Sequence, residues 1–294
     1  MKYFQLTLIV IALIIVSNNC DDNTGVNNKL YYLGQSPPGD SAIVFAKDII
    51  SRGNIHGRIV FSQDCKDILW TIVDRAARTA KIQAITYENE KWSDVYTPTF
   101  AIKGMTSNAL FSIDGKKLFY RVREKSGWQI KYSVKSDSGW SVPKSDGFLL
   151  NPTSSFTGSG KAYYTGYLAD APWNRGTYRA EITDTGYANI ELLDSTINSK
   201  YIDYTPYISL EEDFILFSSS RPSEEENMFI NISFRNSDGS WTEPERIHDV
   251  IKYQGNARFP AISPDGKYLF FCGDDGNIYW VDIKVLDKLR PQPK

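Results

Sequence analysis

Histidine and cysteine are scarce in this chain, and their scarcity removes several kinds of chemistry from consideration. Two histidines and three cysteines are spread over 294 residues, whereas a zinc site usually gathers several such ligands. Basic residues do not outnumber acidic ones, with 33 Lys and Arg against 35 Asp and Glu. The positive excess that binds nucleic acid through its phosphates is therefore missing. We expect no metal, no cofactor and no nucleic acid partner.

Long helical patterns are also absent after residue 20, and aromatic and β-branched residues fill the periodic segments instead. Apolar residues make up 41% of the chain and aromatic residues 14%, which is enough for one sizeable core. This composition predicts an all-β domain.

The first twenty residues differ from the rest. Lys2 gives a positive start, residues 6–16 form a nearly unbroken apolar run, and Ser17-Asn18-Asn19 leads into Cys20. The run is too short to cross a bilayer comfortably, so it predicts a cleaved export signal. Its end resembles a bacterial lipoprotein signal in which Cys20 becomes the lipidated first residue, in a loose form like that of Bacteroidetes lipoproteins. The alternative is a plain secretory signal with an incidental cysteine.

This resemblance implies a signal peptide at 1–19 and a lipidated tether at 20–29, with the protein attached to the outer membrane. Asp21-Asp22 resembles the acidic signal that sends some Bacteroidetes lipoproteins to the cell surface. These aspartates also fit the solvated start of a polar tether. The periplasmic face and the cell surface both remain open.

Residues 260–283 contain a repeated unit of three strands, with polar turns at residues 263–266 and 274–276. Matching turns begin at Ser62, Ser112, Thr157 and Ser209. Their spacing of about 45 to 54 residues is typical of four-stranded propeller blades. The chain is therefore predicted to be a single five-bladed β-propeller.

The unit Ser263-Pro264-Asp265-Gly266-Lys267 and the opening at residues 32–46 resemble propeller lipoproteins of Bacteroidetes built from TolB-type repeats. The resemblance covers residues 30–288 and leaves a tail at 289–294. The earlier repeats have fourth strands, expected near residues 96–102 in the first blade and at 244–250 in the fourth, whereas the last repeat has three strands. A strand within residues 42–50 is therefore expected to complete the last repeat and close the ring. TolB itself has six blades, which is the alternative count.

Two further patterns follow from the repeat. Trp92, Trp140 and Trp241 recur just after the turn into the fourth strand, which favours packing between blades over sugar stacking. Cys65 lies in a turn, whereas Cys272 lies at the far end of a strand. Because a disulfide needs Cα atoms within about 7 Å, we predict that these two cysteines do not pair with each other.

Motifs for catalysis are incomplete. The segment around Gly160-Lys161 lacks the glycine and hydroxyl of a phosphate loop, and Ser112-Ile113-Asp114-Gly115 departs from the Asp-box of sialidases by one residue. TolB-like oligogalacturonate lyases hold a metal with histidines, but only His56 and His248 occur here. No Gly-x-Ser-x-Gly motif is present. Enzymatic activity is not expected.

The resemblance implies that loops between second and third strands and connections between blades share one end of the ring. Two insertions remain there as candidates for function, at 168–177 and 219–227. Neither is required by the repeat, and loops on a rigid scaffold commonly carry function. An aromatic residue beside arginine is a plausible anchor for a partner. Alternatively, Trp173 folds back over its own blade and the glutamates are merely solvated. The candidate binding residues are Asp170, Trp173, Arg175, Arg221, Glu224 and Glu225.

These patterns lead to one functional hypothesis, with two alternatives from other classes. We expect a monomeric, membrane-anchored and non-enzymatic propeller that presents a loop face to a protein or glycan of the cell envelope. The alternatives are a carbohydrate-active enzyme, either a lyase or a hydrolase, and a purely structural envelope protein.

Overall fold

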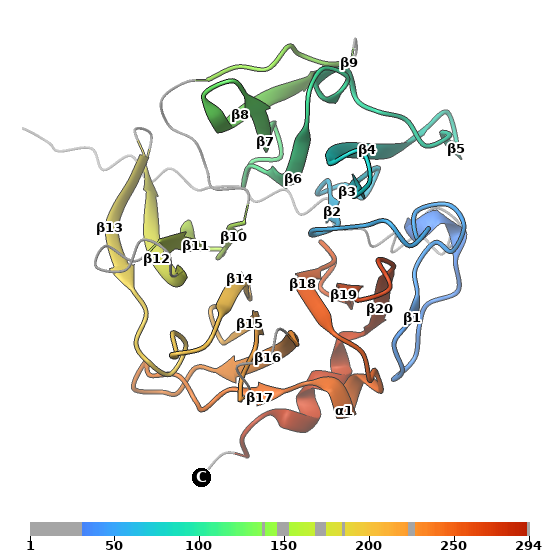
Figure 1. The fold of residues 1–294 in the computed structure, drawn as a ribbon. Coiled ribbons are helices and arrows are strands. Elements are labelled where there is room, and N and C mark those ends of the chain that lie inside the picture. Colours follow the sequence, from blue (N-terminus) through green and yellow to red (C-terminus); the bar gives the residue numbers. More distant parts are fainter. Residues whose placement is uncertain are drawn as a thin grey trace, which may run out of the picture.

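Five four-stranded antiparallel sheets surround a common axis as the blades of a propeller (Figure 1). The computed structural model describes residues 31–136, 139–145, 153–167, 175–183, 186–222 and 227–292. Within these residues the helices are short, and the sheets account for the architecture. The predicted all-β, five-bladed fold is confirmed, and the six-bladed alternative is not adopted.

The strands follow the chain from blade to blade. Blade 1 contains β2 (Val60–Phe61), β3 (Asp67–Asp74), β4 (Thr79–Glu88) and β5 (Lys91–Trp92). Blade 2 contains β6 (Thr106–Phe111), β7 (Lys117–Glu124), β8 (Gly127–Ser136) and β9 (Gly139–Trp140). Blade 3 contains β10 (Ser155–Phe156), β11 (Lys161–Tyr167), β12 (Arg175–Thr183) and β13 (Gly186–Leu192). Blade 4 contains β14 (Asp203–Ile208), β15 (Phe214–Ser219), β16 (Phe229–Phe234) and β17 (Glu245–Arg246).

Blade 5 combines both ends of the domain. It contains β18 (Ala257–Ile262), β19 (Tyr268–Gly273) and β20 (Ile278–Asp282), with β1 (Ile43–Val44) as its outermost strand. The short helices are η1 (Tyr31–Gly34), η2 (Thr99–Ala101), α1 (His248–Ile251) and η3 (Ile283–Leu289).

The repeated serine organises the turn between the first and second strands of a blade. In blade 5 the Ser263 hydroxyl donates to Asp265 at 2.6 Å and accepts from the Tyr268 amide at 3.0 Å. Gly266 completes the turn with a φ of 71°, a conformation that glycine adopts without a Cβ penalty. Ser112 makes the same pair of contacts, at 2.5 and 2.9 Å. The turns predicted from the repeat are therefore present.

A second hydrogen bond repeats between blades. Asn108, Thr205 and Phe259 each have positive φ at a bulge in an innermost strand, so their N–H groups point away from their own ladder. Hydroxyls of the preceding blade accept from these groups: Thr71 from Asn108 at 3.1 Å, Thr165 from Thr205 at 2.8 Å, and Ser218 from Phe259 at 3.1 Å. These contacts set the position of each blade against its neighbour.

The amino-terminal strand closes the ring, as predicted. Strand β1, in blue, lies beside β20, in red (Figure 1), with Ile43 opposite Trp280 and Val44 opposite Tyr279. The Phe45 amide continues the ladder by donating to the Ile278 carbonyl at 2.8 Å. Strand β1 thus covers the edge that β20 would otherwise expose and becomes the outermost strand of blade 5.

The closing strand is shorter than the predicted segment of residues 42–50. After Phe45 the chain turns, with positive φ at Ala46 and Asp48. The Ser51 hydroxyl fixes this turn by donating to the Phe45 carbonyl at 2.7 Å and accepting from the Ile278 amide at 3.0 Å.

The outer strands of blades 1 and 4 differ from the prediction. Residues 96–102 and 244–250 were expected to be extended, but the structure has η2 and α1 within these ranges. Phe100, Ala101 and Ile251 are buried there, because the chain leaves one blade at this point and packs against the next. A helical turn places these neighbouring side chains on the inner side, which a strand with alternating faces cannot do.

The recurring tryptophans pack between blades, as the repeat indicated. Trp241 of blade 4 belongs to a buried cluster that includes Tyr163 of blade 3. The Trp140 ring contacts Phe100, from the connection after blade 1, edge to face at 5.5 Å.

The two internal cysteines do not pair with each other. Cys272 is a free, buried thiol, and burial raises its pKa to about 12. The prediction about Cys65 and Cys272 is confirmed.

The closing strand offers a matched test, because Phe45 is fully buried and Ile43 is 46% exposed. The Phe45 ring packs against Phe270 at 5.1 Å and Trp280 at 5.2 Å. Phe45→Ala should lower the free energy of unfolding by about 3 to 5 kcal/mol through the cavity it leaves. Ile43→Ala should cost much less. Denaturant unfolding monitored by tryptophan fluorescence measures both, and equal losses would contradict closure by this segment.

Candidate functional site

A pocket of about 310 Å³ opens between the first and last blades. Its walls come from the connection 51–57, the β3–β4 hairpin, the start of β18 and the β19–β20 hairpin. The residues that line it are Gly53, Asn54, Ile55, His56, Val73, Arg75, Arg258, Phe259, Cys272, Gly273, Asp274, Asp275 and Gly276. Loops between second and third strands and connections between blades therefore meet at one end, as the repeat predicted.

Backbone hydrogen bonds hold this connection against both blades. The Ile55 amide donates to the Gly276 carbonyl of blade 5 at 3.0 Å, and the Val73 amide of blade 1 donates to the Asn54 carbonyl at 2.8 Å. The Gly53 amide also donates to the Asn277 side chain at 2.9 Å. The pocket consequently has fixed walls.

One wall of the pocket carries positive charge. The His56 ring packs edge-on against Phe259 at 5.2 Å, and Arg75 and Arg258 lie near it. Burial of the ring lowers the pKa of His56, although its side chain still reaches solvent, and the charges of Arg258 and Arg75 lower that pKa further. His56 is therefore mostly neutral at pH 7.

Asp274 and Asp275 also line the pocket. Asp275 accepts from the Asn277 amide at 3.0 Å, from the Asn277 side chain at 2.7 Å and from the Tyr279 hydroxyl at 3.0 Å. Asp274 accepts from the Tyr253 hydroxyl at 3.1 Å. Burial raises the pKa of both tyrosines, and the adjacent carboxylates raise it further. These carboxylates are positioned by neutral donors of their own blade.

The channel at the centre of the ring is crossed by a side chain. Arg58, on the approach to blade 1, donates to the Ser154 carbonyl at 2.8 Å and the Pro206 carbonyl at 2.9 Å. These acceptors belong to blades 3 and 4, on the other side of the axis. Burial lowers the pKa of Arg58 to about 10. The candidate site is therefore the pocket between blades 5 and 1, since Arg58 obstructs the axis.

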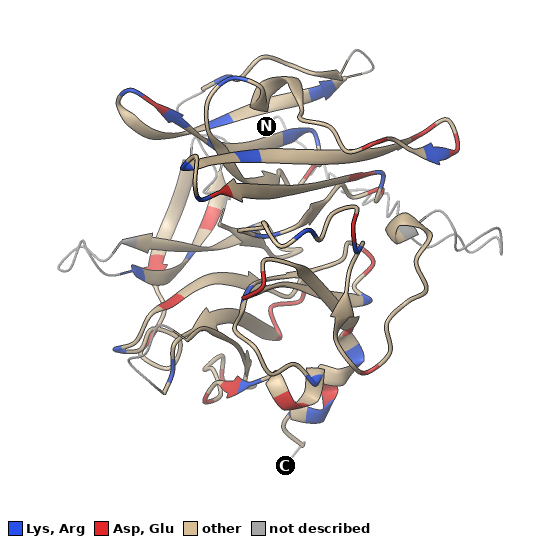
Figure 2. Ribbon diagram, turned by 45° about the vertical axis from the view of Figure 1, so that its right-hand side comes forward, with Lys and Arg blue, Asp and Glu red and all other residues tan. Residues whose placement is uncertain are grey.

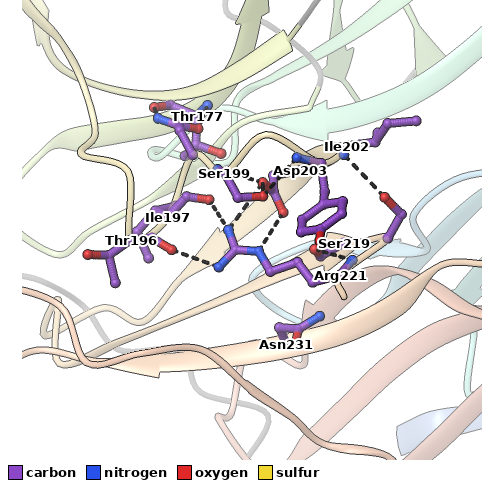
Figure 3. A network of polar contacts seen from close by, with 12 residues as sticks. Thr177, Thr196, Ile197, Ser199, Ile202, Asp203, Ser219, Arg221 and Asn231 are labelled. Atoms are coloured by element: carbon purple, nitrogen blue, oxygen red, sulfur yellow. Dashed lines mark hydrogen bonds and ion pairs between the residues drawn. The ribbon is translucent and has the colours of Figure 1, made fainter. Parts of the chain in front are cut away.

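Arg221, a predicted binding residue, lies in an internal network of polar contacts (Figure 3). Its guanidinium approaches the Asp203 carboxylate, with Nε to Oδ1 at 3.2 Å and Nη2 to Oδ2 at 3.1 Å. It also donates to the carbonyls of Thr196 at 2.8 Å and Ile197 at 2.6 Å.

The partner of Arg221 is more deeply buried than Arg221 itself. The Asp203 side chain is 1% exposed and that of Arg221 is 15% exposed. Asp203 also accepts from the Ser199 amide at 2.8 Å and hydroxyl at 2.6 Å. Arg221 therefore joins the connection before blade 4 to the end of β15, and its donors are engaged within the chain.

The other predicted site residues are only partly placed. Arg175 is exposed at the start of β12, and it lies close enough to Tyr204 for its charge to affect that hydroxyl. Cys20 and the remaining candidates lie outside the described residues: Asp170, Trp173, Glu224 and Glu225. A patch joining Trp173, Arg175 and Arg221 stays a prediction.

The sequence interpretation missed the pocket, although it placed the contributing loops at one end. It considered His56 only as a metal ligand and did not select Arg75 or Arg258. These arginines come from the first and last blades, so no short motif joins them. One signal in the sequence was the short distance along the chain from the closing segment at residues 42–50 to His56, which places this histidine beside the junction of the first and last blades.

The residues that the structure describes include neither a cluster of metal ligands nor a membrane-spanning helix. Among them, no three His, Cys, Asp or Glu side chains lie close enough together to hold a metal ion. Within the same residues, the helices are too short or too polar to cross a membrane. Lys and Arg are interspersed with Asp and Glu along the ribbon, so neither sign of charge dominates (Figure 2).

Comparison with known proteins does not assign this chain to a family. No family model matches the chain, and no curated protein matches it. A structure assigned to TolB from Agrobacterium tumefaciens is similar at 17% identity and a TM-score of 0.47, covering 79% of this chain and 78% of that one.

Enzymes are among the similar structures as well. An aldose sugar dehydrogenase from Streptomyces coelicolor has 11% identity and a TM-score of 0.44, with 83% of this chain and 99% of that chain covered. A gluconolactonase from Xanthomonas campestris has 10% identity and a TM-score of 0.42, with coverages of 84% and 97%. Similarity at this level does not transfer an activity.

The Arg221 network predicts a stability effect at a position first selected for binding. Arg221→Ala removes the countercharge of a buried carboxylate, which typically costs about 3 to 5 kcal/mol. Lys116→Ala, at an exposed turn residue of blade 2, should leave stability nearly unchanged. Thermal and denaturant unfolding of both variants measure the difference. If the two variants unfolded alike, the network would not contribute to the fold.

Proposed function

We propose that this protein is a non-enzymatic binding protein of the cell envelope, anchored to the outer membrane by a lipid on Cys20. Its rigid propeller presents the loop end to a protein or glycan. The observation that carries this proposal is the pocket with charged walls at the loop end, held open by hydrogen bonds from two blades. Fixed concave surfaces with a few placed polar groups are typical of ligand sites.

The state of His56 favours binding over catalysis. A catalytic imidazole is usually oriented by a hydrogen bond from its second nitrogen, often to a carboxylate. The His56 ring contacts Phe259, and in the described part of the chain no carboxylate holds either ring nitrogen. A carbohydrate-active lyase or hydrolase is the competing proposal, and assays for sugar release or unsaturated products from envelope polysaccharides test it.

The anchor has its own test. Cys20→Ala should release the protein from the membrane fraction or leave it as an uncleaved precursor, because the modified sulfur carries the lipid. Mass spectrometry of the mature amino terminus should find a diacylated cysteine. Cleavage elsewhere would contradict the anchor. So would a disulfide between Cys20 and Cys65, since one sulfur cannot carry both bonds.

The partner is tested by affinity capture from envelope extracts. Loss of an aromatic or arginine anchor commonly costs about 2 kcal/mol, or roughly thirtyfold in affinity. Trp173→Ala and Arg175→Ala should therefore weaken capture, whereas Lys116→Ala at the opposite end should not. Arg221 is unsuitable for this comparison because its substitution should disturb folding. Equal capture by all three variants would place the interface away from the insertions.

A further inference from the structure

The two arginines of the pocket lack acidic partners. Neither Arg75 nor Arg258 forms an ion pair with a carboxylate of the described residues. Arg258 is within hydrogen-bonding reach of the Tyr204 hydroxyl, which is neutral. Arg75 is exposed at the pocket wall. Two positive charges thus line the pocket without a direct ion pair to Asp274 or Asp275, which line it as well.

We propose that this pocket binds an oxyanion, the carboxylate or phosphate of a small ligand, between Arg75, Arg258 and His56. The inference rests on the proposed binding role of the loop end and specifies a ligand class for it. A guanidinium presents parallel N–H donors that match the oxygens of carboxylate and phosphate groups. Two guanidiniums from different blades can engage one such group from two sides.

The volume of the pocket and its two aspartates limit the rest of the ligand. A volume of about 310 Å³ lies at the small end of the range for ligand sites. Asp274 and Asp275 are carboxylates held by Tyr253, Tyr279 and Asn277. They can accept hydrogen bonds from hydroxyl groups but repel a second anion. The pocket therefore suits a polyhydroxylated ligand with one anionic end.

The walls are already arranged for such a ligand. A Cβ on Gly276 would lie 2.7 Å from a backbone atom of Gly53, and one on Gly273 would lie 2.5 Å from the Tyr253 hydroxyl. The β19–β20 hairpin therefore packs tightly against both the connection and the neighbouring tyrosine. Binding to a site that needs little rearrangement costs little conformational entropy, so little affinity is lost.

His56 reports on the charge that enters the pocket. The charged or titratable groups around it are Arg75, Arg258, Asp274, Asp275, Cys272 and Tyr204. Burial of the ring lowers the pKa of His56, and the charges of Arg258 and Arg75, which form no ion pair with a carboxylate of the described residues, lower it further. An anion bound beside them stabilises the imidazolium, so the pKa of His56 should rise toward its ordinary value.

The experiment follows the two imidazole resonances by NMR across a pH titration of the full chain in detergent, at constant ionic strength. The probes are glucuronate, glucose 6-phosphate and glucose, which share a hexose ring and differ in charge. At least one anionic probe should shift the His56 resonance and raise its pKa by about half a unit or more. Glucose should not. His248, held by the Gly255 carbonyl at 2.8 Å, serves as the internal reference.

Arginine variants test whether the anionic probe binds at Arg75 and Arg258. Arg75→Gln and Arg258→Gln should each weaken binding of the anionic probe about tenfold or more, whereas Lys116→Gln should not. Arg75 is exposed, so its variant remains informative if Arg258→Gln disturbs folding. The tighter of the two anionic probes identifies carboxylate or phosphate as the preferred group.

Three outcomes would overturn the site: no shift with either anion, equal shifts with glucose, or unchanged binding by the Arg75 variant. Failure here is distinguishable from failure of the proposed function. If the protein still captured its envelope partner but bound no anion, only the proposed anion site would be wrong. If it bound the anion but captured no partner, only the proposed envelope partner would be wrong.

Discussion

Closure of the ring by the amino-terminal strand is the constraint on which the rest of the structure depends. Without β1 the last blade would have three strands, and β1 completes it by pairing with β20, which ties the start of the domain to its end. The same segment then runs through residues 51–57 into blade 1 and forms one wall of the pocket. The candidate site consequently exists only in the closed ring.

Contacts between blades explain why closure uses aromatic packing. At three junctions a hydroxyl of one blade accepts from the bulged N–H of the next. At the closing junction the corresponding position is Cys272, whose thiol lies 3.5 Å from the Ile55 carbonyl. A thiol is a weak donor, so this junction depends more on the cluster of Phe45, Phe270 and Trp280.

Most of the fold could be predicted from the repeat because its turns need particular residues. A serine followed by aspartate and glycine fixes a tight turn locally at Ser112 and Ser263, and the looser matches that begin at Ser62, Thr157 and Ser209 complete the count of five blades. The helices η2 and α1 were mispredicted because the path from one blade to the next depends on packing between blades. Phe100 and Ile251 are apolar in either conformation, so hydrophobicity alone did not distinguish strand from helix.

The candidate site was less predictable because its groups meet only in three dimensions. Arg221 was selected for its place in an insertion, but its role depends on Asp203, which is buried on another strand. Arg75 and Arg258 were overlooked because the repeat gives them no special position. A sequence reveals which loops share an end of the ring, whereas pairing of charges depends on side-chain direction.

The position of the pocket links ligand binding to the stability of the ring. Arg75 belongs to blade 1 and Arg258 to blade 5, on the two sides of the closing junction. An anion that contacts both would add two attractions across this junction. A ligand that binds only the folded state adds about 2.7 kcal/mol at a hundredfold excess over its dissociation constant. Since neither blade alone presents both arginines, that contribution would act on the closed ring as a unit.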